Sequence, residues 1–393
     1  MKNMKKIIIV NNNMKIGGVQ KSLCNLLWAI EKDYDITLSL FRASGELLDT
    51  LPPSVKVIES KGPFRLLGMS QSESKSSVKD YLLRAALALH SRVFGRSSTL
   101  GLMLKYQPKL PDKYDFAISY LHNGRRKAFY GGTQEYVLHC INADKKIAFL
   151  HADYVKCGAN HKENDALMES FDVIAACSEG CKAVFDSALP HLADRCHTVC
   201  NCHNFDLIKR MASDDPIIYD ESYVNVITVS RISHEKGLDR AIRSLERAVL
   251  NGCKVKLHIV GGGPKKAELE QLVDELNLNN NVSFYGEQKN PYKYMKNADL
   301  LLLSSYHEAA PMVIDEALCL GVPTLTTKTT SSKDMVEDRA CGWVCENTDE
   351  ALIEAFCRVV SDKGLLKTTK ERLQSFKVHN ELAVGQLADI LSK

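Results

Sequence analysis

The sequence predicts an α/β protein made of two Rossmann-like, doubly wound parallel sheets. Short apolar runs alternate with stretches of helical periodicity, as expected of repeated strand–helix units. This pattern stops once, at residues 207–222, and then begins again. The chain has 393 residues, which is more than one ordinary domain holds. We therefore expect two α/β domains that face each other across a cleft.

The first half begins with an all-apolar strand at Lys5–Val10, typical of a strand buried on both faces. A glycine-containing loop follows, and then a helix in which Val19, Leu23, Leu27 and Ile30 recur at helical spacing. The next strand is expected at 36–40. Later elements of this half are strands at 115–120, 146–150 and 173–176 and a helix at 179–185.

Residues 60–112 interrupt the alternation. The polar stretch 70–77 predicts a mobile loop. Residues 78–94 predict a basic amphipathic helix, with Tyr81, Leu82, Ala85, Leu89 and Val93 on one side. The segment 61–127 holds thirteen Lys/Arg against four Asp/Glu. Such a helix could hold the protein on an anionic membrane, or it could pack on its own domain with solvated cations.

The second half repeats the strand–helix pattern after the linker. Strands are expected at 225–229, 255–260, 282–285, 299–303 and 324–326, with helices between them. We predict an N-terminal domain at 1–206, a linker at 207–222, a C-terminal domain at 223–364 and a helical segment at 365–393. Ligands of such sheets bind outside the carboxyl ends of the strands.

Composition excludes several classes of protein. Hydrophobic residues make up 45% and charged residues 25%, so the chain is neither disordered nor collagen-like. It contains no apolar run of the roughly 18 residues that a membrane span needs, and its N-terminus lacks the apolar core of a signal peptide. The net charge of +3 is too small to indicate nucleic-acid binding. Together with thirteen cysteines, this favours a reducing, cytoplasmic location.

Two carboxylates follow the strand at 299–303. Glu308 lies in a loop, and Glu316 lies about one and a half turns into the helix that Pro311 introduces. A carboxylate can accept two hydrogen bonds from a vicinal diol. The backbone N–H groups around the helix start can meet sugar hydroxyls or phosphate; they belong to Ala309, Ala310, Met312 and Val313. The alternative is an ordinary amphipathic helix with solvated acids.

Two cations and a glycine loop follow the first strands of the second half. Arg231 ends one strand, and Lys236 precedes a helix, so the pair could neutralise a diphosphate or merely be surface cations. The sequence GGGP at 261–264, which includes Gly263, would let the backbone approach a ligand closely.

The first half has fewer candidate residues. Gly17 and Gly18 precede a helix whose N–H groups could hold a β-phosphate, although a tight turn is the alternative. His151 follows the strand at 146–150, where a ligand is expected.

Two possible metal sites receive little support. Asp33 and Asp35 form an Asp-x-Asp pair, but at the end of the sheet away from the ligand. The side chains of Cys196, Cys200, Cys202 and His203 could bind zinc, but the stretch also fits a strand and a loop.

These motifs occur in one order along nearly the whole chain: Gly17-Gly18, His151, Arg231 with Lys236, GGGP, and Glu308-x7-Glu316. Together they resemble the family 4 (group 1) retaining glycosyltransferases of the GT-B fold. The segments YDFAISYLHNG and KKIAFLHADY are similar to versions in bacterial surface-polysaccharide enzymes. Two positions depart from the family pattern, because Ala309 replaces a frequent glycine and Gln20 replaces a frequent glutamate.

The resemblance implies a role for each motif. Arg231 and Lys236 would neutralise the donor diphosphate, Glu316 would hold the nucleotide ribose, and Glu308 would touch the donor sugar. Gly18 would lie near the phosphates and acceptor, and His151 near the reaction centre. Retention would proceed by front-face substitution, with no carboxylate nucleophile.

The resemblance also implies the overall activity. The chain would be a retaining, metal-independent hexosyltransferase with no cofactor, using a nucleotide-diphosphate sugar as donor, with UDP expected before GDP or ADP. The acceptor would be a glycan or lipid-linked glycan of a bacterial capsular, exo- or lipopolysaccharide, and the protein would lie in the cytoplasm or at the inner membrane face.

Other functions stay open at this point. They are a GT-B sugar-nucleotide epimerase, a non-catalytic nucleotide-sugar-binding partner and a dinucleotide oxidoreductase. Against the last, neither half shows a G-x-G-x-x-G fingerprint opening a helix.

Overall fold

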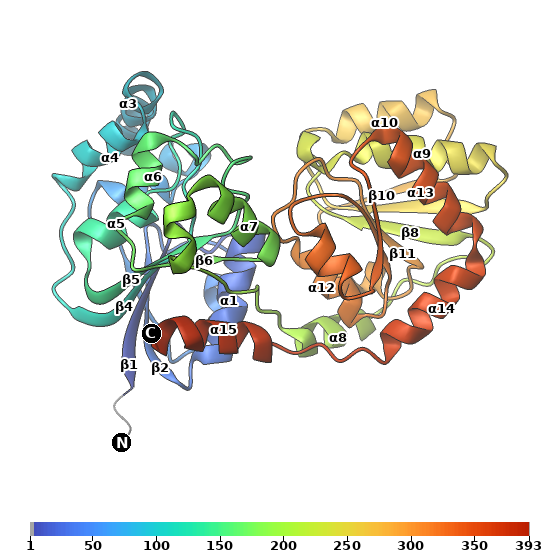
Figure 1. The fold of residues 1–393 in the computed structure, drawn as a ribbon. Helices are drawn as coiled ribbons and strands as arrows, with labels where there is room; N and C mark the ends of the chain where they lie inside the picture. Colours follow the sequence, from blue (N-terminus) through green and yellow to red (C-terminus); the bar gives the residue numbers. More distant parts are fainter. Residues whose placement is uncertain (1–3, 393) are drawn as a thin grey trace. The chain divides into compact units, whose positions relative to one another are not determined.

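The computed structural model describes residues 4–392, and the chain divides into two units. One unit holds the described residues up to Cys202 together with those from Asn380 onward, and the other is His203–His379. Each unit contains one parallel sheet flanked by helices, which confirms the predicted fold class of two Rossmann-like domains (Figure 1).

The sheet of the first unit has seven strands in the order β3-β2-β1-β4-β5-β6-β7. Strand β1 is central and pairs in parallel with β2 and β4, so that Ile9 lies opposite both Leu38 and Ile118. The strands are β1 (Lys5–Asn11), β2 (Tyr34–Leu40), β3 (Lys56–Glu59), β4 (Lys113–Ser119), β5 (Asn142–Leu150), β6 (Val173–Ala176) and β7 (Cys196–Thr198). The main helices are α1 (Gly18–Ile30), α3 (Val78–Phe94), α4 (Arg96–Leu104), α5 (Thr133–Cys140), α6 (Lys162–Met168) and α7 (Glu179–Ala188).

The core of the first unit forms because strand β1 is buried on both faces, as its apolar run predicts. Ile7 and Ile9 pack against the apolar face of α1. Helix α15 (Glu381–Ser392) covers the same cluster with Leu387 and Ile390, and Lys5 donates from Nζ to the carbonyl of Leu391 at 3.2 Å. Helix α15 is therefore part of the first unit.

The sheet of the second unit has six strands in the order β10-β9-β8-β11-β12-β13. They are β8 (Val224–Val229), β9 (Val255–Val260), β10 (Val282–Gly286), β11 (Leu300–Leu303), β12 (Thr324–Thr327) and β13 (Gly342–Cys345). The helices are α8 (Phe205–Ser213), α9 (Leu238–Leu250), α10 (Lys266–Glu275), α11 (Tyr292–Met295), α12 (Met312–Cys319), α13 (Asp349–Ser361) and α14 (Lys363–Gln374).

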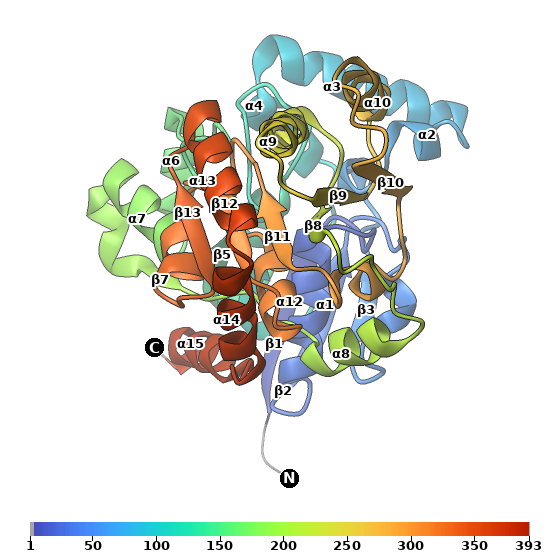
Figure 2. The ribbon, with the colours of Figure 1, turned by 90° about the vertical axis from the view of Figure 1, so that its right-hand side faces the viewer.

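Two apolar clusters cover opposite faces of this second sheet. Leu300 and Leu302 of β11 face the cluster that includes α9, α10 and α13. Leu301 and Leu303 face the other cluster, to which α12 contributes Ile314 and Ala317. This alternation follows from the pleat. As a result α12 is fixed against the sheet by its apolar side. Figure 2 shows this unit turned by 90°, with α9 and α10 seen nearly end-on.

The segment between the two sheets differs from the sequence-based prediction. Residues 207–222 were predicted to be the linker, but helix α8 occupies Phe205–Ser213 and belongs to the second unit. Asn204 caps this helix by accepting a hydrogen bond from the backbone N–H of Leu207 at 3.0 Å. Ile208 and Ala212 are buried, and Ile208, Ala212 and Tyr292 form a small core.

The prediction of a loop at 70–77 was wrong. Helix α2 (Gln71–Ser74) lies here, and it begins with a capping box. The Ser70 hydroxyl accepts from the backbone N–H of Glu73, and the Glu73 carboxylate accepts from the backbone N–H of Ser70 at 2.6 Å. Helix α3 occupies the predicted residues, 78–94. Among residues 4–392, no helix combines the length and the apolar character that crossing a membrane requires.

Candidate active site

Two loops leave the same edge of the second sheet because β8 and β11 are adjacent parallel strands. The loop after β8 carries Arg231 and Lys236, and the loop after β11 carries Glu308. Backbone and side-chain hydrogen bonds join the two loops. The N–H of Tyr306 donates to the carbonyl of Glu235 at 2.9 Å, and Ser304 Oγ donates to the carbonyl of Lys236 at 3.0 Å.

Gly237 shapes the first of these loops. It follows the 3₁₀ turn His234–Lys236 and has a φ of +57°, in the left-handed region. A Cβ at this position would lie 2.4 Å from the carbonyl oxygen of Ser304. Only glycine therefore allows the turn to lie against the β11 loop, and this contact holds Lys236 beside Glu308.

Lys236 and Glu308 form an ion pair, with 2.6 Å between Nζ and Oε1. The two side chains are only 18% and 11% exposed, so the pair is largely shielded from solvent. Ser305 Oγ also donates to Glu308 Oε1 at 2.8 Å. The predicted diphosphate-binding cation and the predicted sugar-binding acid are thus direct partners.

Arg231 has a different environment. Its side chain is 78% exposed, and its Nη2 lies 3.1 Å from Oε1 of Glu235. The two predicted cations therefore share one edge of the sheet, but each has its own carboxylate. Arg231 is free to reorient at low cost because an exposed ion pair contributes little.

The glycine loop after β9 packs against the Arg231 loop. The N–H of Ile232 donates to the carbonyl of Gly262 at 2.7 Å. A Cβ on Gly261 would lie 1.8 Å from the carbonyl oxygen of Ser230, and one on Gly263 would lie 2.2 Å from that of Ile232. These glycines are therefore needed so that two backbone segments can approach each other, which supports the loop that carries Arg231.

Helix α12 begins at Met312, with Pro311 in the position just before it. Ala309 and Ala310 precede the helix, Val313 is its second residue and Glu316 its fifth. Glu316 is buried, with 4% exposure, and Tyr292 Oη donates to its Oε1 at 3.2 Å. The contact with Tyr292, 24 positions away, was not predicted, because no local pattern connects the two residues.

Asp315, the neighbour of Glu316, connects α12 to His203 and Arg339. His203 Nε2 lies 3.2 Å from one carboxylate oxygen, and Arg339 Nη1 lies 2.5 Å from the other. Burial by itself raises the pKa of Asp315, but hydrogen bonds and charge from His203 and Arg339 outweigh it and lower the pKa to about 2. The carboxylate is therefore charged at neutral pH.

Sequence reasoning also missed Arg240, which is buried in the first turn of α9. Its Nη1 donates to Asn347 Oδ1 at 2.8 Å and to the Ser304 carbonyl at 3.3 Å. Its guanidinium lies 4.6 Å from the ring centroid of Tyr306. Arg240 thus stabilises the β11 loop that carries Glu308. Its position one turn after Lys236 was the only signal in the sequence.

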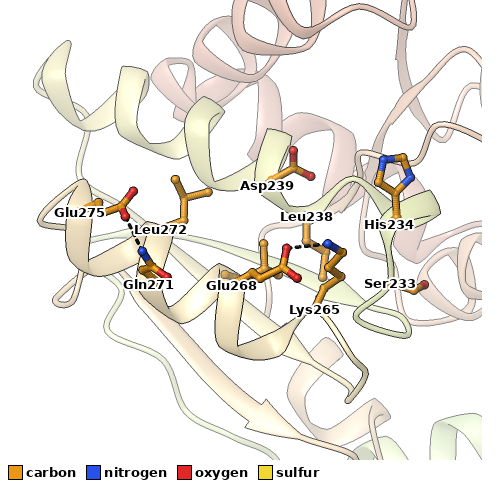
Figure 3. Close-up of a pocket in the computed structure, with 10 residues that line it drawn as sticks. Ser233, His234, Leu238, Asp239, Lys265, Glu268, Gln271, Leu272 and Glu275 are labelled. Carbon is orange, nitrogen blue, oxygen red and sulfur yellow. Dashed lines mark hydrogen bonds and ion pairs between the residues drawn. The ribbon is translucent and has the colours of Figure 1, made fainter.

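A cavity of about 330 Å³ lies beside the Lys236 turn, between α9 and α10 (Figure 3). His234, Leu238, Lys265 and Glu268 are among its lining residues. None of Arg231, Lys236, Glu308 and Glu316 lines it. Lys265 and Glu268 pair with each other at 2.6 Å, as the dashed line in Figure 3 shows. This cavity is therefore distinct from the predicted donor site.

In the first unit, the glycine pair lies at the start of α1. Gly17 is the capping residue, with an extended backbone at φ −174°, and Gly18 is the first helical residue. A Cβ on Gly18 would meet nothing within 4 Å. The fold of the unit therefore does not require glycine at position 18, and the surface there is open.

His151 follows β5, where the sequence predicts it. Its ring packs against Tyr120, with the centroids 4.5 Å apart, and the Tyr120 hydroxyl lies 3.0 Å from Ser22 Oγ of α1. Burial, and after it the charge of His122, lower the pKa of His151 to about 3, so the imidazole is neutral at pH 7. Its Nε2 is buried and has no hydrogen-bond partner among residues 4–392.

The two metal hypotheses find no support in the structure. Asp33 and Asp35 lie at the amino end of β2, away from the carboxyl edge. His203 pairs with Asp315, and Cys196, Cys200 and Cys202 belong to the other unit. In the described part of the chain, no group of three or more His, Cys, Asp or Glu side chains could hold a metal ion.

Residues 215–376 match a family model described as "Glycosyl transferases group 1". The lipopolysaccharide glucosyltransferase WaaG of Escherichia coli K12 is 35% identical to this chain over 143 residues, which is 36% of this chain and 38% of WaaG. An uncharacterized glycosyltransferase of Methanocaldococcus jannaschii, MJ1059, is 32% identical over 162 residues, which is 40% of this chain and 39% of that protein. The matched part thus spans about two fifths of these relatives.

Solved structures resemble the chain over nearly its full length. Anabaena HepE, in complex with UDP and glucose, has a TM-score of 0.69 and 18% identity, covering 99% of this chain and all of that one. TarM has a TM-score of 0.67 and 14% identity, covering 100% and 99%. At these identities the similarity establishes the fold, which is GT-B.

Proposed function

We propose that this chain, whose residues 215–376 form a group 1 glycosyl transferase domain within a GT-B fold, transfers a sugar from a nucleotide-diphosphate sugar to a glycan hydroxyl. Bacterial surface polysaccharide, whether capsular, exo- or lipopolysaccharide, is the proposed product. Relatives named for lipopolysaccharide synthesis, such as WaaG and LpsD of Rhizobium meliloti, support this choice. UDP is the proposed nucleotide, before GDP or ADP, because HepE binds UDP and glucose.

The pairing of Lys236 with Glu308 carries this proposal. It places a shielded cation beside a carboxylate at the carboxyl edge of β8 and β11, and Arg231 lies on the same loop as Lys236. Two cations suit the negative charge of a diphosphate, and a carboxylate can accept a hydrogen bond from a sugar hydroxyl. One edge of the second sheet brings both kinds of group close together in space, which fits a sugar diphosphate better than a simple nucleotide.

The proposed chemical step is a front-face substitution, as the resemblance to the retaining glycosyltransferases implies. The bond between the anomeric carbon and the β-phosphate oxygen breaks, and its electron pair remains on that oxygen. Arg231 and Lys236 stabilise the developing negative charge. The acceptor oxygen bonds to the anomeric carbon on the same face, and its proton passes to the leaving phosphate oxygen. The configuration is retained, with no carboxylate nucleophile and no metal ion.

The remaining site residues bind and orient the two substrates. Glu316 would hold the ribose diol, and the N–H groups of Ala309, Ala310, Met312 and Val313 would meet the donor at the start of α12. Gly17 and Gly18 would lie near the phosphates and acceptor, and the neutral imidazole of His151 would lie near the reaction centre. Gly263 would let the backbone approach the donor closely, and it also supports the loop of Arg231.

Calorimetric titration with UDP, GDP, ADP and NAD tests the donor site. The expected result is binding of one nucleoside diphosphate, weakened in both Glu316→Ala and Arg231→Ala. Arg247→Ala is a matched control, because Arg247 is exposed in the last turn of α9, at the helix end away from Lys236. Binding of NAD alone, or of no nucleotide, would contradict the proposal.

A second assay separates transfer from related activities. A labelled donor sugar is incubated with the protein, with and without a bacterial lipid-linked glycan fraction. Transfer predicts that label enters the glycan and that nucleoside diphosphate release depends on the acceptor. Conversion of the donor to another nucleotide sugar without acceptor would identify an epimerase. Donor binding without either reaction would identify a binding partner.

A further inference from the structure

Glu316 of α12 has a partner on another helix, the phenol of Tyr292. Tyr292 Oη donates to Glu316 Oε1 at 3.2 Å, and the two side chains are only 3% and 4% exposed. The last torsion of a glutamate side chain has no strong preference of its own, so a hydrogen bond to one oxygen selects one orientation of the carboxylate plane. The Tyr292 hydroxyl therefore helps to fix the direction in which Glu316 presents its carboxylate.

The ring of Tyr292 is held by helix α8. It belongs to the small core formed with Ile208 and Ala212 of α8, against which Phe205 also packs. Figures 1 and 2 both show α8 beside α12 in the second unit. Because protein cores are close-packed, the ring cannot turn away from Glu316 without opening this core.

Helix α11, which carries Tyr292, has only four residues, too few to be stable by itself. Hydrogen bonds to α8 hold it in place. Asn290 Nδ2, in the loop before α11, donates to the carbonyl of Met211 at 2.8 Å. Lys296 Nζ, just after α11, donates to Ser213 Oγ at 2.9 Å. The position of the Tyr292 hydroxyl beside α12 thus depends on α8.

The start of α8 also contacts α12 directly. His203, two positions before α8, has its Nε2 3.2 Å from a carboxylate oxygen of Asp315. The His203 ring stacks on that of Phe205, the first residue of α8, with 5.3 Å between the centroids. Cys319 Sγ donates to the carbonyl of Phe205 at 3.8 Å. Asp315 and Cys319 are one helical turn apart, so these contacts fix the rotation of α12 at the turn that carries Glu316.

A ribose diol requires a carboxylate that is oriented in this way. Its 2′- and 3′-hydroxyls donate together to one carboxylate only when the plane of that carboxylate faces them. A carboxylate accepts about four hydrogen bonds, enough for one phenol and two ribose hydroxyls. A side chain held by surrounding contacts loses less conformational entropy on binding than a mobile one, which increases affinity. The Tyr292 contact therefore favours a ligand with a complete diol over one without.

We propose that Tyr292 is a positioning residue of the donor site: its hydroxyl orients Glu316 toward the ribose diol and so makes the site selective for ribonucleotides over deoxyribonucleotides. Helices α8 and α11 hold Tyr292 in the position that this requires. The inference rests on the proposed function, which takes Glu316 as the group that binds the ribose. It adds a residue to that site and names the ribose hydroxyls as a determinant of specificity.

A positioning role and a purely structural role predict different results when the hydroxyl is removed. In a structural role, loss of the hydroxyl would shift α12 and weaken the binding of every nucleotide equally. In a positioning role, the loss is confined to nucleotides with ribose hydroxyls, because only those hydroxyls contact Glu316. Tyr292→Phe is the suitable change, since it keeps the ring in the core with Ile208 and Ala212.

Calorimetric titration with UDP and with 2′,3′-dideoxy-UDP tests the inference; the corresponding GDP or ADP pair is used if the intact protein binds one of those nucleotides instead. The intact protein is expected to bind UDP at least about tenfold more tightly than the dideoxy compound. Tyr292→Phe is expected to weaken UDP binding about fivefold and to leave the binding of dideoxy-UDP unchanged. In a transfer assay, the same variant should raise KM for the donor and leave kcat little changed, because two phosphates separate the ribose from the bond that breaks.

Two variants control for other effects. Tyr294→Phe removes the hydroxyl of another buried tyrosine of α11, whose ring lies 4.6 Å from that of Tyr285, and it should change the binding of neither nucleotide. Glu316→Ala removes the group through which Tyr292 acts. In the Glu316→Ala background, Tyr292→Phe should therefore cause no further loss of UDP binding. Circular dichroism melting checks that every variant is folded.

Three outcomes would overturn the inference while leaving the proposed transfer untouched. One is equally tight binding of UDP and dideoxy-UDP to the intact protein. Another is an equal loss of binding of both nucleotides in Tyr292→Phe, or no loss of either. The third is the same loss in Tyr294→Phe as in Tyr292→Phe, which would assign the effect to the packing of α11. Absence of nucleoside diphosphate binding to the intact protein would instead contradict the proposed function, and the inference would fall with it.

Discussion

Lys236 Nζ lies 2.6 Å from Glu308 Oε1, although the two residues are 72 positions apart in the chain. Each comes from a loop that follows one of two adjacent strands, β8 and β11. A diphosphate that binds Lys236 must compete with Glu308 for it. This ion pair therefore links phosphate binding to the position of the acid that we assign to the donor sugar.

Replacing Glu308 should separate nucleotide binding from transfer. In Glu308→Gln, Lys236 loses its carboxylate and becomes more available to a phosphate, so we expect about fivefold tighter binding of the nucleoside diphosphate, which corresponds to about 1 kcal/mol. Transfer should fall because the sugar loses its acceptor group. Calorimetry and a transfer assay measure the two effects. Weaker nucleotide binding in Glu308→Gln would show that the pair does not compete with phosphate.

Gly18 and Gly237 should respond differently to alanine. A Cβ at Gly18 meets nothing within 4 Å, so Gly18→Ala should fold normally and lose activity only through a steric effect on a bound ligand. Gly237→Ala should lose about 2 kcal/mol or more of stability, because alanine is strained at φ +57° and its Cβ would approach the Ser304 carbonyl. Urea unfolding distinguishes the two. An unchanged transfer rate in Gly18→Ala would show that the glycine loop is not part of the binding site.

Asp315 should make the second unit sensitive to acid. The pKa of Asp315 is about 2 in the folded chain, below the ordinary 3.8. Its contribution to the free energy of unfolding is therefore fully present above pH 4 and is lost as the pH falls toward 2. The expected loss is about 2 kcal/mol. The measurement is the urea midpoint against pH, followed by the fluorescence of Trp343 in a Trp28→Phe background, since these are the only two tryptophans.

Asp315→Asn in the same background is the control. The urea midpoint of Asp315→Asn should be lower than that of the parent at pH 7. Between pH 4 and 2 it should fall less steeply than that of the parent. Parallel curves for the two proteins would show that the ion pairs of Asp315 with His203 and Arg339 do not stabilise this unit.

His151 should not titrate near neutral pH. Its pKa of about 3 lies below the ordinary 6.5, so the folded protein holds a neutral ring, and stability falls as the pH drops from about 6.5 toward 3. We expect a transfer rate without a His151 inflection between pH 5 and 8. His151→Ala should lower transfer with little effect on nucleoside diphosphate binding. As a control, His191→Gln replaces an exposed histidine and should change neither the transfer rate nor nucleoside diphosphate binding. An inflection near pH 6.5 that His151→Ala removes would contradict the buried, neutral state.

Removal of divalent metal ions should leave transfer intact. Arg231 and Lys236 supply the positive charge that a metal ion provides in metal-dependent transferases. Assays after treatment with EDTA, with and without added magnesium, measure this. A loss of activity that magnesium restores would assign a metal to the diphosphate and reduce the role of the two cations.

The sequence by itself predicted the regular elements well where one signal was strong. Strand β9 was expected at 255–260 and occupies those residues, because an apolar run followed by glycine is unambiguous. Helix α8 was missed although Phe205, Ile208, Met211 and Ala212 carry helical spacing, because the linker was placed across it. The capping box of Ser70 and Glu73 was also present in the sequence, but the polar composition of 70–77 concealed it.

Only the tertiary structure decided which side chains meet and which faces lie open. The sequence placed Lys236 and Glu308 on two separate loops, and the adjacency of β8 and β11 made them partners. The sequence also predicted the bounds of helix α3 as the structure has them. It did not reveal that Asp80 and Ser91 are buried whereas Leu82 and Leu89 are exposed. Helical spacing of apolar residues indicates that a helix has an apolar face and a polar face. Which face is buried depends on contacts such as Arg65 with Asp80, which no local pattern contains.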